Sequence, residues 1–544
     1  MTGGQGLAAQ LVREGVQHVF GVPGVQLDYA VDGLARLSDQ IEYWNTRHEQ
    51  TTSYMADGYA RSSGRIGVCM VVPGPGLLNA LAGVATAFAC SSRVLCISGQ
   101  IPSDAIGLGL GLLHEIPRQS EILAALTKWS AIARAPADVP RLVHEAMRQL
   151  RTGRPRPVGL EVPPDVLQAE ADLDTLDPVL EDEPLRPDPG VIARAARLLE
   201  SAQRPAIYAG GGVVAGNASE ALRKLAERLQ WPVVMSPNGR GALDDRHPLA
   251  LTWLAGRGVL ADADLVLGVG SRFMGGQQPL RLAADARYVL LNAEASDLGA
   301  PREPAVAIHA DAALGLGALE AELSTASSNR PWIELSVLRR WADDILVQVQ
   351  PQFGWVSALR AALPENGVLV NEFTQVGYLS QAAFPVYAPR TYIAPGYQGT
   401  LGYGFPTALG ARVANPDRAV LSISGDGGIG WALSELSTAR KYNIGLVTVV
   451  FNDRAYGNVR RAQVEQFDSR LLGTDLLNPD FVGLAESFGV RGARATTPDE
   501  LQGLLCETLG PDSEPVLIDV PVPAMPNPFR RLRETPVPQS APVR

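Results

Sequence analysis

The sequence predicts an α/β fold class with three doubly wound parallel-sheet domains. Short, uninterrupted apolar runs recur along the whole chain, as is typical of strands buried on both faces of a parallel sheet. Amphipathic stretches lie between them, and such alternation builds sheets that helices cover on both sides. The predicted strands are residues 68–72, 94–97, 265–269, 288–291, 419–423, 446–451 and 516–520.

The stretch 218–230 shows how a helix between two of these strands is predicted. Leu222, Leu225 and Leu229 recur at helical spacing, and charged residues occupy the opposite face. A helix with one apolar stripe packs on a sheet, and ligands of such folds bind at the carboxyl ends of the strands. We therefore expect functional residues just after the predicted strands.

Two polar segments, of which the first is acidic and proline-rich, divide the chain. The first covers residues 172–190 and the second covers residues 324–332. They predict an N-terminal domain at 1–170, a central domain at 188–325 and a C-terminal domain at 345–525. The remaining tail is also rich in proline, and we expect it at the surface.

Composition excludes several classes of protein. The 544 residues include 47 basic and 57 acidic side chains and a net charge of −10, which argues against a nucleic-acid footprint. No apolar run approaches the roughly 20 residues that cross a bilayer, and no secretory signal is evident. We expect a cytoplasmic protein without membrane or nucleic-acid partners. The four cysteines, without a CxxC pair, are expected to be buried in a reducing compartment: Cys69, Cys90, Cys96 and Cys506.

The segment 422–457 carries the most chemical information. A predicted strand runs directly into Gly425-Asp426-Gly427-Gly428, and the next strand ends at Asn452-Asp453. Glycines at a strand end let the backbone approach a phosphate closely. If the two strands are neighbours, Asp426 and Asp453 lie at the same edge of the sheet, where carboxylates can bind Mg²⁺.

This pair of motifs resembles the thiamin diphosphate signature of the acetohydroxyacid (acetolactate) synthase, pyruvate decarboxylase and benzaldehyde lyase superfamily. The resemblance implies that Asp426 and Asp453 bind Mg²⁺ through their side chains and Ala455 through its carbonyl. The family most often has asparagine in place of Asp453, so this chain adds a negative charge there. The cofactor-binding residues implied for this segment are Gly425, Gly427, Gly428, Tyr456 and Gly457.

A second match lies near the N-terminus. Arg47-His48-Glu49-Gln50 is followed by Asp57-Gly58-Tyr59-Ala60-Arg61, which is similar to the synthase pattern. The resemblance implies that Glu49 activates the cofactor by a hydrogen bond to its aminopyrimidine ring. It also places three cofactor-binding residues in the segments FGVPG and VVPGPGLLNA, which are Gly24, Pro75 and Asn79.

Two further segments resemble the family's cofactor cradle. In GTLGYG, the resemblance implies that the Gly399 carbonyl accepts the cofactor's amino group and that Leu401 forces the cofactor into a bent shape. In NEFTQVGY, Thr374 and Gln375 stand at the diphosphate-side positions, where the synthases usually have Gln-His. The family forms its active sites between subunits, which implies a homodimer or homotetramer.

The resemblance leaves the substrate open. Gln100 and His114 are predicted to contact it, and His114 is equally well explained as a structural histidine. Ala462 stands where the synthases have a tryptophan, which implies a wider pocket. Of the synthases' FAD-contacting segment only Arg272-Phe273 remains, before Met274-Gly275-Gly276, so FAD is possible but weakly indicated.

The function predicted from the resemblance is an acetolactate synthase-like enzyme that decarboxylates a 2-oxo acid such as pyruvate and joins the product to a second carbonyl compound, a 2-oxo acid or an aldehyde. Alternatives within the superfamily are a 2-oxo acid decarboxylase, a benzaldehyde lyase-like carboligase and a 2-hydroxyacyl-CoA lyase. An alternative of another class is a non-catalytic paralogue that only binds the cofactor. A dinucleotide-dependent dehydrogenase is disfavoured, because no GxGxxG motif follows the first predicted strand.

Overall fold

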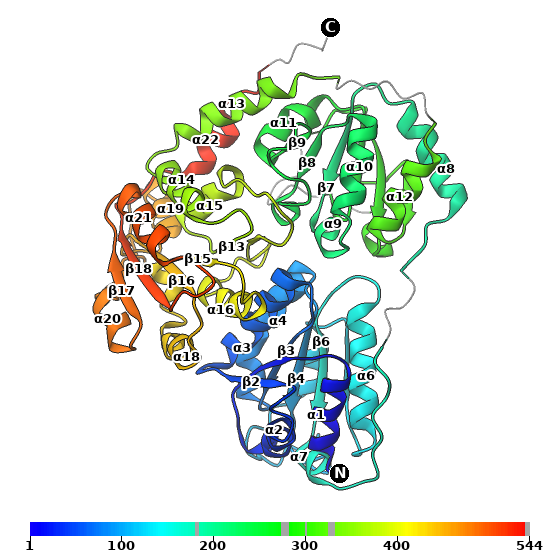
Figure 1. Cartoon of the computed structure of the whole chain (residues 1–544), viewed down its shortest axis with the longest axis vertical. Helices are drawn as coiled ribbons and strands as arrows, with labels where there is room; N and C mark the ends of the chain where they lie inside the picture. The colour runs from blue at the N-terminus through cyan, green and yellow to red at the C-terminus, as the bar shows by residue number, and fades with distance from the viewer. Residues whose placement is uncertain (180–183, 274–281, 300–301, 325–331, 539–544) are drawn as a thin grey trace.

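A computed structural model describes residues 1–179, 184–273, 282–299, 302–324 and 332–538. It contains three six-stranded sheets, and all strand pairs within them are parallel. Each sheet takes its strands from one continuous part of the chain, and helices lie around it (Figure 1). The predicted fold class is therefore confirmed. Every predicted strand overlaps an observed one, and the prediction for 265–269 has the same bounds as the observed strand β10.

The first sheet has the strand order β2-β1-β3-β4-β6-β5. Its strands are β1 His18–Gly21, β2 Glu42–Asn45, β3 Gly67–Val71, β4 Val94–Gly99, β5 Trp129–Ile132 and β6 Val158–Val162. Its helices are α1 Gly3–Arg13, α2 Asp28–Ala35, α3 Glu49–Ser63, α4 Pro75–Cys90, α5 Gln119–Ala124, α6 Asp138–Arg151 and α7 Pro164–Gln168, with a short 3₁₀ turn at Val25–Leu27.

The second sheet has the order β12-β11-β10-β7-β8-β9. Its strands are β7 Pro205–Ala209, β8 Val233–Met235, β9 Ala250–Leu251, β10 Leu265–Val269, β11 Arg287–Asn292 and β12 Val306–His309. Its helices are α8 Pro189–Glu200, α9 Gly211–Ala215, α10 Ser219–Leu229, α11 Trp253–Asp262 and α12 Ala312–Glu322, with 3₁₀ turns at Pro237–Gly239 and Ala295–Asp297. Helix α10 buries its leucine stripe as predicted.

The third sheet has the order β14-β13-β15-β16-β18-β17. Its strands are β13 Val368–Asn371, β14 Tyr392–Ile393, β15 Val420–Gly425, β16 Val447–Asn452, β17 Arg491–Arg494 and β18 Val516–Pro521. The helices in this part of the chain are α13 Leu335–Val347, α14 Gln352–Ala362, α15 Gln375–Ala383, α16 Gly404–Ala414, α17 Asp426–Ile429, α18 Leu436–Lys441, α19 Gly457–Gln466, α20 Phe481–Ser487, α21 Pro498–Thr508 and α22 Pro528–Glu534, with a 3₁₀ turn at Leu433–Glu435.

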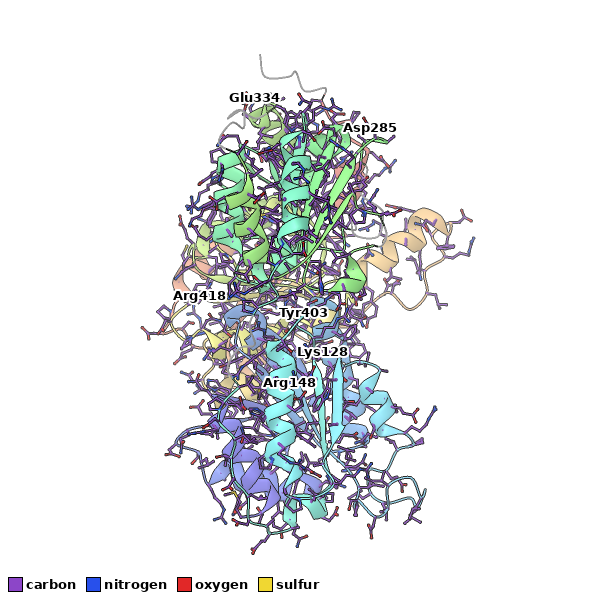
Figure 2. All side chains as sticks on the ribbon, turned by 90° about the vertical axis from the view of Figure 1, so that its right-hand side faces the viewer. Lys128, Arg148, Asp285, Glu334, Tyr403 and Arg418 are labelled. Carbon is purple, nitrogen blue, oxygen red and sulfur yellow. The ribbon has the colours of Figure 1, made fainter. Side chains whose placement is uncertain are left out.

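Helices α3 and α16 join the first and third sheets. A Cβ atom on Gly58 would lie 1.9 Å from the Thr407 carbonyl oxygen, and one on Gly410 would lie 1.9 Å from that of Met55. Glycine is therefore required on both helices for this close crossing. At its edge Arg61 donates a hydrogen bond to the Tyr403 hydroxyl (2.7 Å). Figure 2 shows Tyr403 at mid-height of the molecule, between the lower and upper parts of the chain.

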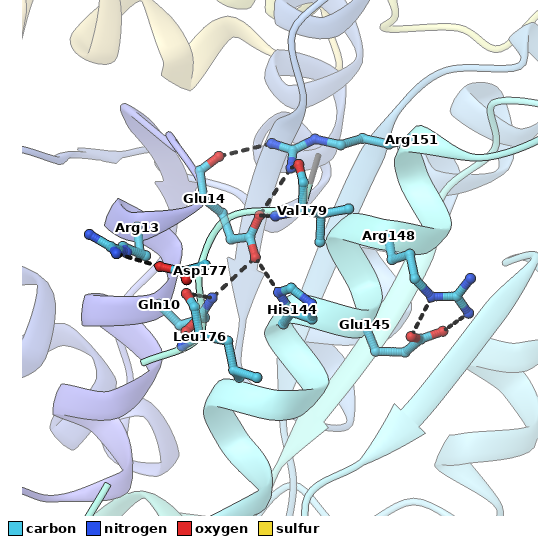
Figure 3. A network of polar contacts seen from close by, with 10 residues as sticks. All are labelled: Gln10, Arg13, Glu14, His144, Glu145, Arg148, Arg151, Leu176, Asp177 and Val179. Atoms are coloured by element: carbon cyan, nitrogen blue, oxygen red, sulfur yellow. Dashed lines mark hydrogen bonds and ion pairs between the residues drawn. The ribbon is translucent and has the colours of Figure 1, made fainter. Parts of the chain in front are cut away.

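The start of the first predicted linker is bound to the N-terminal body by Glu14. The Glu14 side chain is fully buried, and its Oε1 accepts hydrogen bonds from Gln10 (3.1 Å) and His144 (2.9 Å). Its Oε2 accepts from Arg151 (3.0 Å) and from the backbone N–H of Val179 (3.1 Å). Figure 3 shows this network, in which one carboxylate joins α1, α6 and the outgoing chain.

Two expectations about the chain need correction. Cys69 and Cys96 are buried as expected, but Cys90 is half-buried and Cys506 is exposed, because it lies on the solvent side of α21. The proline-rich tail does not simply lie on the surface: α22 packs through Leu532, which is fully buried. Within the described residues, no helix has the length and apolar character needed to cross a bilayer.

Replacing Glu14 by glutamine is expected to lower the melting temperature of the protein by several degrees. The substitution leaves the guanidinium of Arg151 without its buried counter-charge, and breaking a buried pair is far more costly than losing an exposed one. Asp177→Asn is the matched control, because the Arg13–Asp177 pair is exposed. Thermal denaturation followed by circular dichroism measures both variants. Equal melting temperatures for the two would contradict the assigned role of Glu14.

Candidate active site

A cavity of about 360 Å³ opens at the carboxyl ends of β13, β15 and β16. This is where an open parallel sheet binds ligands, because loops on either side of a strand-order reversal separate there. The cavity brings together residues that lie far apart in the chain. The predicted site residues that line it are Thr374, Gln375, Leu401, Gly425, Asp426, Gly427, Gly428, Asp453, Ala455, Tyr456 and Gly457.

Glycines shape one wall of the cavity. A Cβ atom on Gly427 would lie 2.7 Å from the Tyr456 ring, and one on Gly457 would lie 2.3 Å from Asp453 Oδ2. Side chains at these positions would fill the space that the backbone leaves open. A backbone exposed in this way can donate its N–H groups to a phosphate, so the wall fits a diphosphate.

Two carboxylates face each other at the edge of this wall. Strands β15 and β16 are neighbours, which places Asp426 and Asp453 together as expected. Burial, together with the nearby charge of Asp426, raises the pKa of Asp453 to about 6. Asn478 donates a hydrogen bond to Asp426 Oδ2 (2.6 Å), which orients that carboxylate. Two carboxylates that repel each other are stabilised by a divalent cation between them.

The backbone of Ala455 completes this set of oxygen donors. Ala455 pairs with Asp475 in an isolated bridge, whose hydrogen bonds use the Tyr456 N–H and the Arg454 carbonyl. The Ala455 carbonyl is therefore left out of the bridge, and its N–H donates to Asp453 Oδ1 (3.3 Å). Two carboxylates and a carbonyl fit Mg²⁺, which takes oxygen ligands and retains water. Within the described residues, no cluster of three or more His, Cys, Asp or Glu side chains forms a metal site.

Glu372 also lines the cavity, although no motif in the sequence predicts a role for it. Glu372 follows β13, is almost fully buried, and accepts a hydrogen bond from the Gly402 N–H (2.8 Å). A Cβ atom on Gly428 would lie 2.3 Å from Glu372 Oε1. The carboxyl group therefore lies between the turn that carries Leu401 and the Gly425–Gly428 segment. A single Glu after a strand gives no sequence signal, because only the fold surrounds it with these two turns.

The N-terminal residues predicted for the cofactor's pyrimidine side do not line this cavity. Glu49 is the first residue of α3, and its Oε2 accepts a hydrogen bond from the Asn79 side chain (3.0 Å). Pro75 begins α4 after Gly74, whose φ of 59° favours glycine. Pro75 and Asn79 are exposed. Gly24 directly precedes a 3₁₀ turn, and a Cβ atom on it would lie 2.4 Å from the Val72 side chain.

Gln100 and His114 lie near this pyrimidine-side turn, in a polar network. The Gln100 side chain is buried and donates a hydrogen bond to Glu161 Oε1 (3.0 Å). Gln119 donates to the same oxygen (2.7 Å) and accepts from the Gly74 N–H (2.8 Å). The His114 ring bonds Gln26 Oε1 (3.0 Å). Glu161 and Gln119 thus hold the turn at Gly74 in place through hydrogen bonds. No sequence motif predicted this role for either residue.

Gly399 and the synthases' FAD segment complete the predicted set. Gly399 has a φ of 59° and lies two residues before Leu401, which lines the cavity and is 42% exposed. Phe273 is buried against the rings of Tyr208 and Tyr288. Positions 274–276 lie outside the described residues.

Replacing Glu372 by glutamine is expected to reduce the pH dependence of stability. Burial raises the pKa of Glu372 from 4.5 to about 7. Between these values the folded protein binds more protons than the unfolded chain, so ionisation of Glu372 lowers the free energy of unfolding as the pH rises. Thermal denaturation of the cofactor-free protein between about pH 5 and pH 7 measures this slope. An unchanged slope in Glu372→Gln would contradict the assignment.

Comparison with known proteins agrees with this geometry. Three family models match: the thiamine pyrophosphate enzyme N-terminal TPP binding domain over residues 1–122, the central domain over 192–319, and the C-terminal TPP binding domain over 374–520. The probable acetolactate synthase large subunit of Methanocaldococcus jannaschii is 33% identical, over 97% of this chain and 93% of its own.

Two further relatives differ in their named activity. The acetolactate synthase isozyme 1 large subunit of Escherichia coli is 30% identical, over 96% of this chain and 94% of its own. The probable 2-ketoarginine decarboxylase of Pseudomonas aeruginosa is 34% identical, over 92% and 91%. The family models, the near full-length relatives and the carboxylate-and-glycine cavity agree, and the chain belongs to the thiamine pyrophosphate-dependent enzymes.

Proposed function

We propose that this enzyme decarboxylates a 2-oxo acid such as pyruvate and joins the product to a second carbonyl compound, as an acetolactate synthase does. The observation that carries the proposal is the cavity at β13, β15 and β16, where a glycine wall adjoins the Asp426–Asp453 pair. The relatives named acetolactate synthase support the same activity. The three domains are proposed to span 1–170, 188–325 and 345–525.

The C-terminal residues hold the cofactor. Asp426, Asp453 and the Ala455 carbonyl bind Mg²⁺, and Gly425, Gly427, Gly428, Tyr456 and Gly457 bind the diphosphate beside it. When bound, thiamin diphosphate supplies a carbon nucleophile that adds to the substrate carbonyl and accepts the electron pair released as CO₂ leaves. Thr374 also lines the diphosphate side, and its hydroxyl already caps α15 by accepting the Gly377 N–H (2.8 Å).

The remaining residues act on protons and on orientation. Glu49 holds a proton at the pyrimidine ring, and the Asn79 amide fixes its carboxylate in place. The Gly399 carbonyl accepts the ring's amino group, and Leu401 supports the bent cofactor. Gly24 and Pro75 shape the N-terminal wall. Gln100, which keeps a second amide hydrogen beside its bond to Glu161, and His114 orient the substrate oxygen.

We propose that the two halves of the site meet between subunits, in a homodimer or a homotetramer. Glu49 and the Asp426 cavity lie in separate parts of one chain, and exposed apolar side chains occur around both. Such clusters mark association surfaces. On the N-terminal side they are Val25, Leu78, Leu108, Leu110 and Leu113. On the C-terminal side they are Leu401, Trp431, Val459, Phe467 and Leu472.

A decarboxylase without ligation is the second candidate. Ala462 on α19 leaves space where the synthases carry a tryptophan, and one relative is named as a probable 2-ketoarginine decarboxylase. A wider site accepts a longer 2-oxo acid without selecting a second one. The enzyme is proposed to act in the cytoplasm, and FAD is not required for either reaction as proposed.

The function is tested by incubating the purified protein with thiamin diphosphate, Mg²⁺ and pyruvate, and measuring CO₂ and acetolactate. Release of both supports the synthase. Parallel reactions with 2-ketoarginine and other 2-oxo acids identify the second candidate, for which an aldehyde appears without a ligated product. If thiamin diphosphate binds and no 2-oxo acid is consumed, the proposed function is wrong.

Mixing two inactive variants tests the shared site. Glu49→Gln removes the proton-holding group, and Asp426→Ala removes a metal ligand, so each variant alone is expected to lose turnover. Random reassociation would give mixed dimers with one intact site, and thus about a quarter of wild-type activity. Turnover is measured after mixing under dissociating conditions, with each variant mixed with itself as the control. No recovery of activity would place both residues in a single-chain site.

A further inference from the structure

Arg461 contacts the cavity wall from behind. It lies on α19, one turn after Gly457, and only 15% of its side chain is exposed. Its Nη1 donates a hydrogen bond to Gln375 Oε1 (2.8 Å), and its Nη2 donates to Asn458 Oδ1. Gln375 and Asn458 both line the cavity, one from the start of α15 and the other from α19. The guanidinium therefore joins two walls of the pocket.

This contact determines the orientation of the Gln375 amide. A guanidinium group has only donors, so it fixes the amide oxygen of Gln375 on its own side. The NH₂ group of Gln375 is then directed away from Arg461, and Gln375 lines the cavity. A donor in this position suits an anion. If the amide were reversed, its oxygen would face that anion instead.

The cavity is lined by negative charge, so a cation next to its wall would favour the binding of an anion. Its lining includes the carboxylates of Glu372, Asp426 and Asp453, and the described residues that line it include no Lys, Arg or His. The nearest carboxylate paired with Arg461 is Glu465, with 4.0 Å between Nε and Oε1. Arg461 is thus a largely buried cation bound mainly to neutral amides. Burial accordingly lowers the pKa of Arg461.

We propose that Arg461 is a positioning residue for the cofactor: it turns the Gln375 amide toward the diphosphate and supplies positive charge that offsets the extra negative charge of Asp453. The inference rests on the proposed place of the diphosphate. A carboxylate of the substrate is the other anion that this arrangement suits. If the anion is the diphosphate, loss of Arg461 weakens cofactor affinity. If the anion is the substrate carboxylate, loss of Arg461 weakens substrate affinity.

Calorimetric titration of the cofactor-free protein with thiamin diphosphate at saturating Mg²⁺ tests the proposal without turnover. Arg461→Gln is expected to raise the Kd about tenfold or more, the scale of a hydrogen-bonding system that involves a charge. It is also expected to weaken the dependence of the Kd on salt, because a Coulombic contribution is lost. Arg461→Lys keeps the charge and is expected to recover part of the cofactor affinity and part of its dependence on salt. A packing role alone would leave the salt dependence unchanged.

Two further variants sharpen the result. Arg460→Gln is the matched control, because Arg460 lies on the same helix and pairs with Asp475 (2.9 Å) instead. In the Asp453→Asn background, Arg461→Gln is expected to weaken cofactor binding less than in the wild type, because less negative charge remains to offset. The proposal is overturned if Arg461→Gln binds thiamin diphosphate like Arg460→Gln, or if only the KM for the 2-oxo acid rises. A protein that binds cofactor but consumes no 2-oxo acid would fail the proposed function and leave this binding test valid.

Discussion

The close crossing of α3 and α16 is the constraint on which the site depends. The two helices approach so closely that only glycine fits at Gly58 and Gly410. Helix α3 begins with Glu49, and α16 begins directly after the turn that carries Leu401. Two elements with proposed cofactor roles are thus attached to opposite members of one rigid helix pair, which fixes how one chain presents its two half-sites to the partner subunit. Any widening of this crossing would move the Glu49 end of α3 relative to the third sheet.

The local motifs could be predicted because each one consists of residues that are consecutive or nearly consecutive in the sequence. Gly425, Asp426 and Gly427 follow a buried strand directly, and the neighbouring strand ends at Asp453, so pairing of β15 with β16 brings the carboxylates together. The repeated apolar runs likewise predicted parallel sheets, since each run is long enough for one buried strand. In these cases strands that follow each other in the chain are also neighbours in the sheet.

Contacts between distant parts of the chain could not be predicted in the same way. Glu372 reads as an ordinary charged residue, and its burial follows from two turns that begin 30 and more residues later. Arg461 reaches Gln375 across 86 positions, and Glu161 supports a turn that begins near Gly74. Helix α22 was not predicted because its proline-rich surroundings suggested a tail at the surface, whereas Leu532 is fully buried. The positions of the catalytic and metal residues in the site remain predictions from the resemblance and the geometry.

The loop before His114 has a consequence for evolving new substrate ranges. Gly107, Gly109 and Gly111 all adopt positive φ angles, and a Cβ atom at any of them would meet no other atom within 4 Å. Backbone conformation alone, and not packing, restricts these three positions, while the leucines between them are exposed. Laboratory evolution that keeps the glycines can therefore exchange those leucines without disturbing the fold of the single chain, and the proposed subunit contact sets the limit on the exchange. A library of variants at these leucines would change the side chains that the loop presents and leave the crossing of α3 and α16 unchanged.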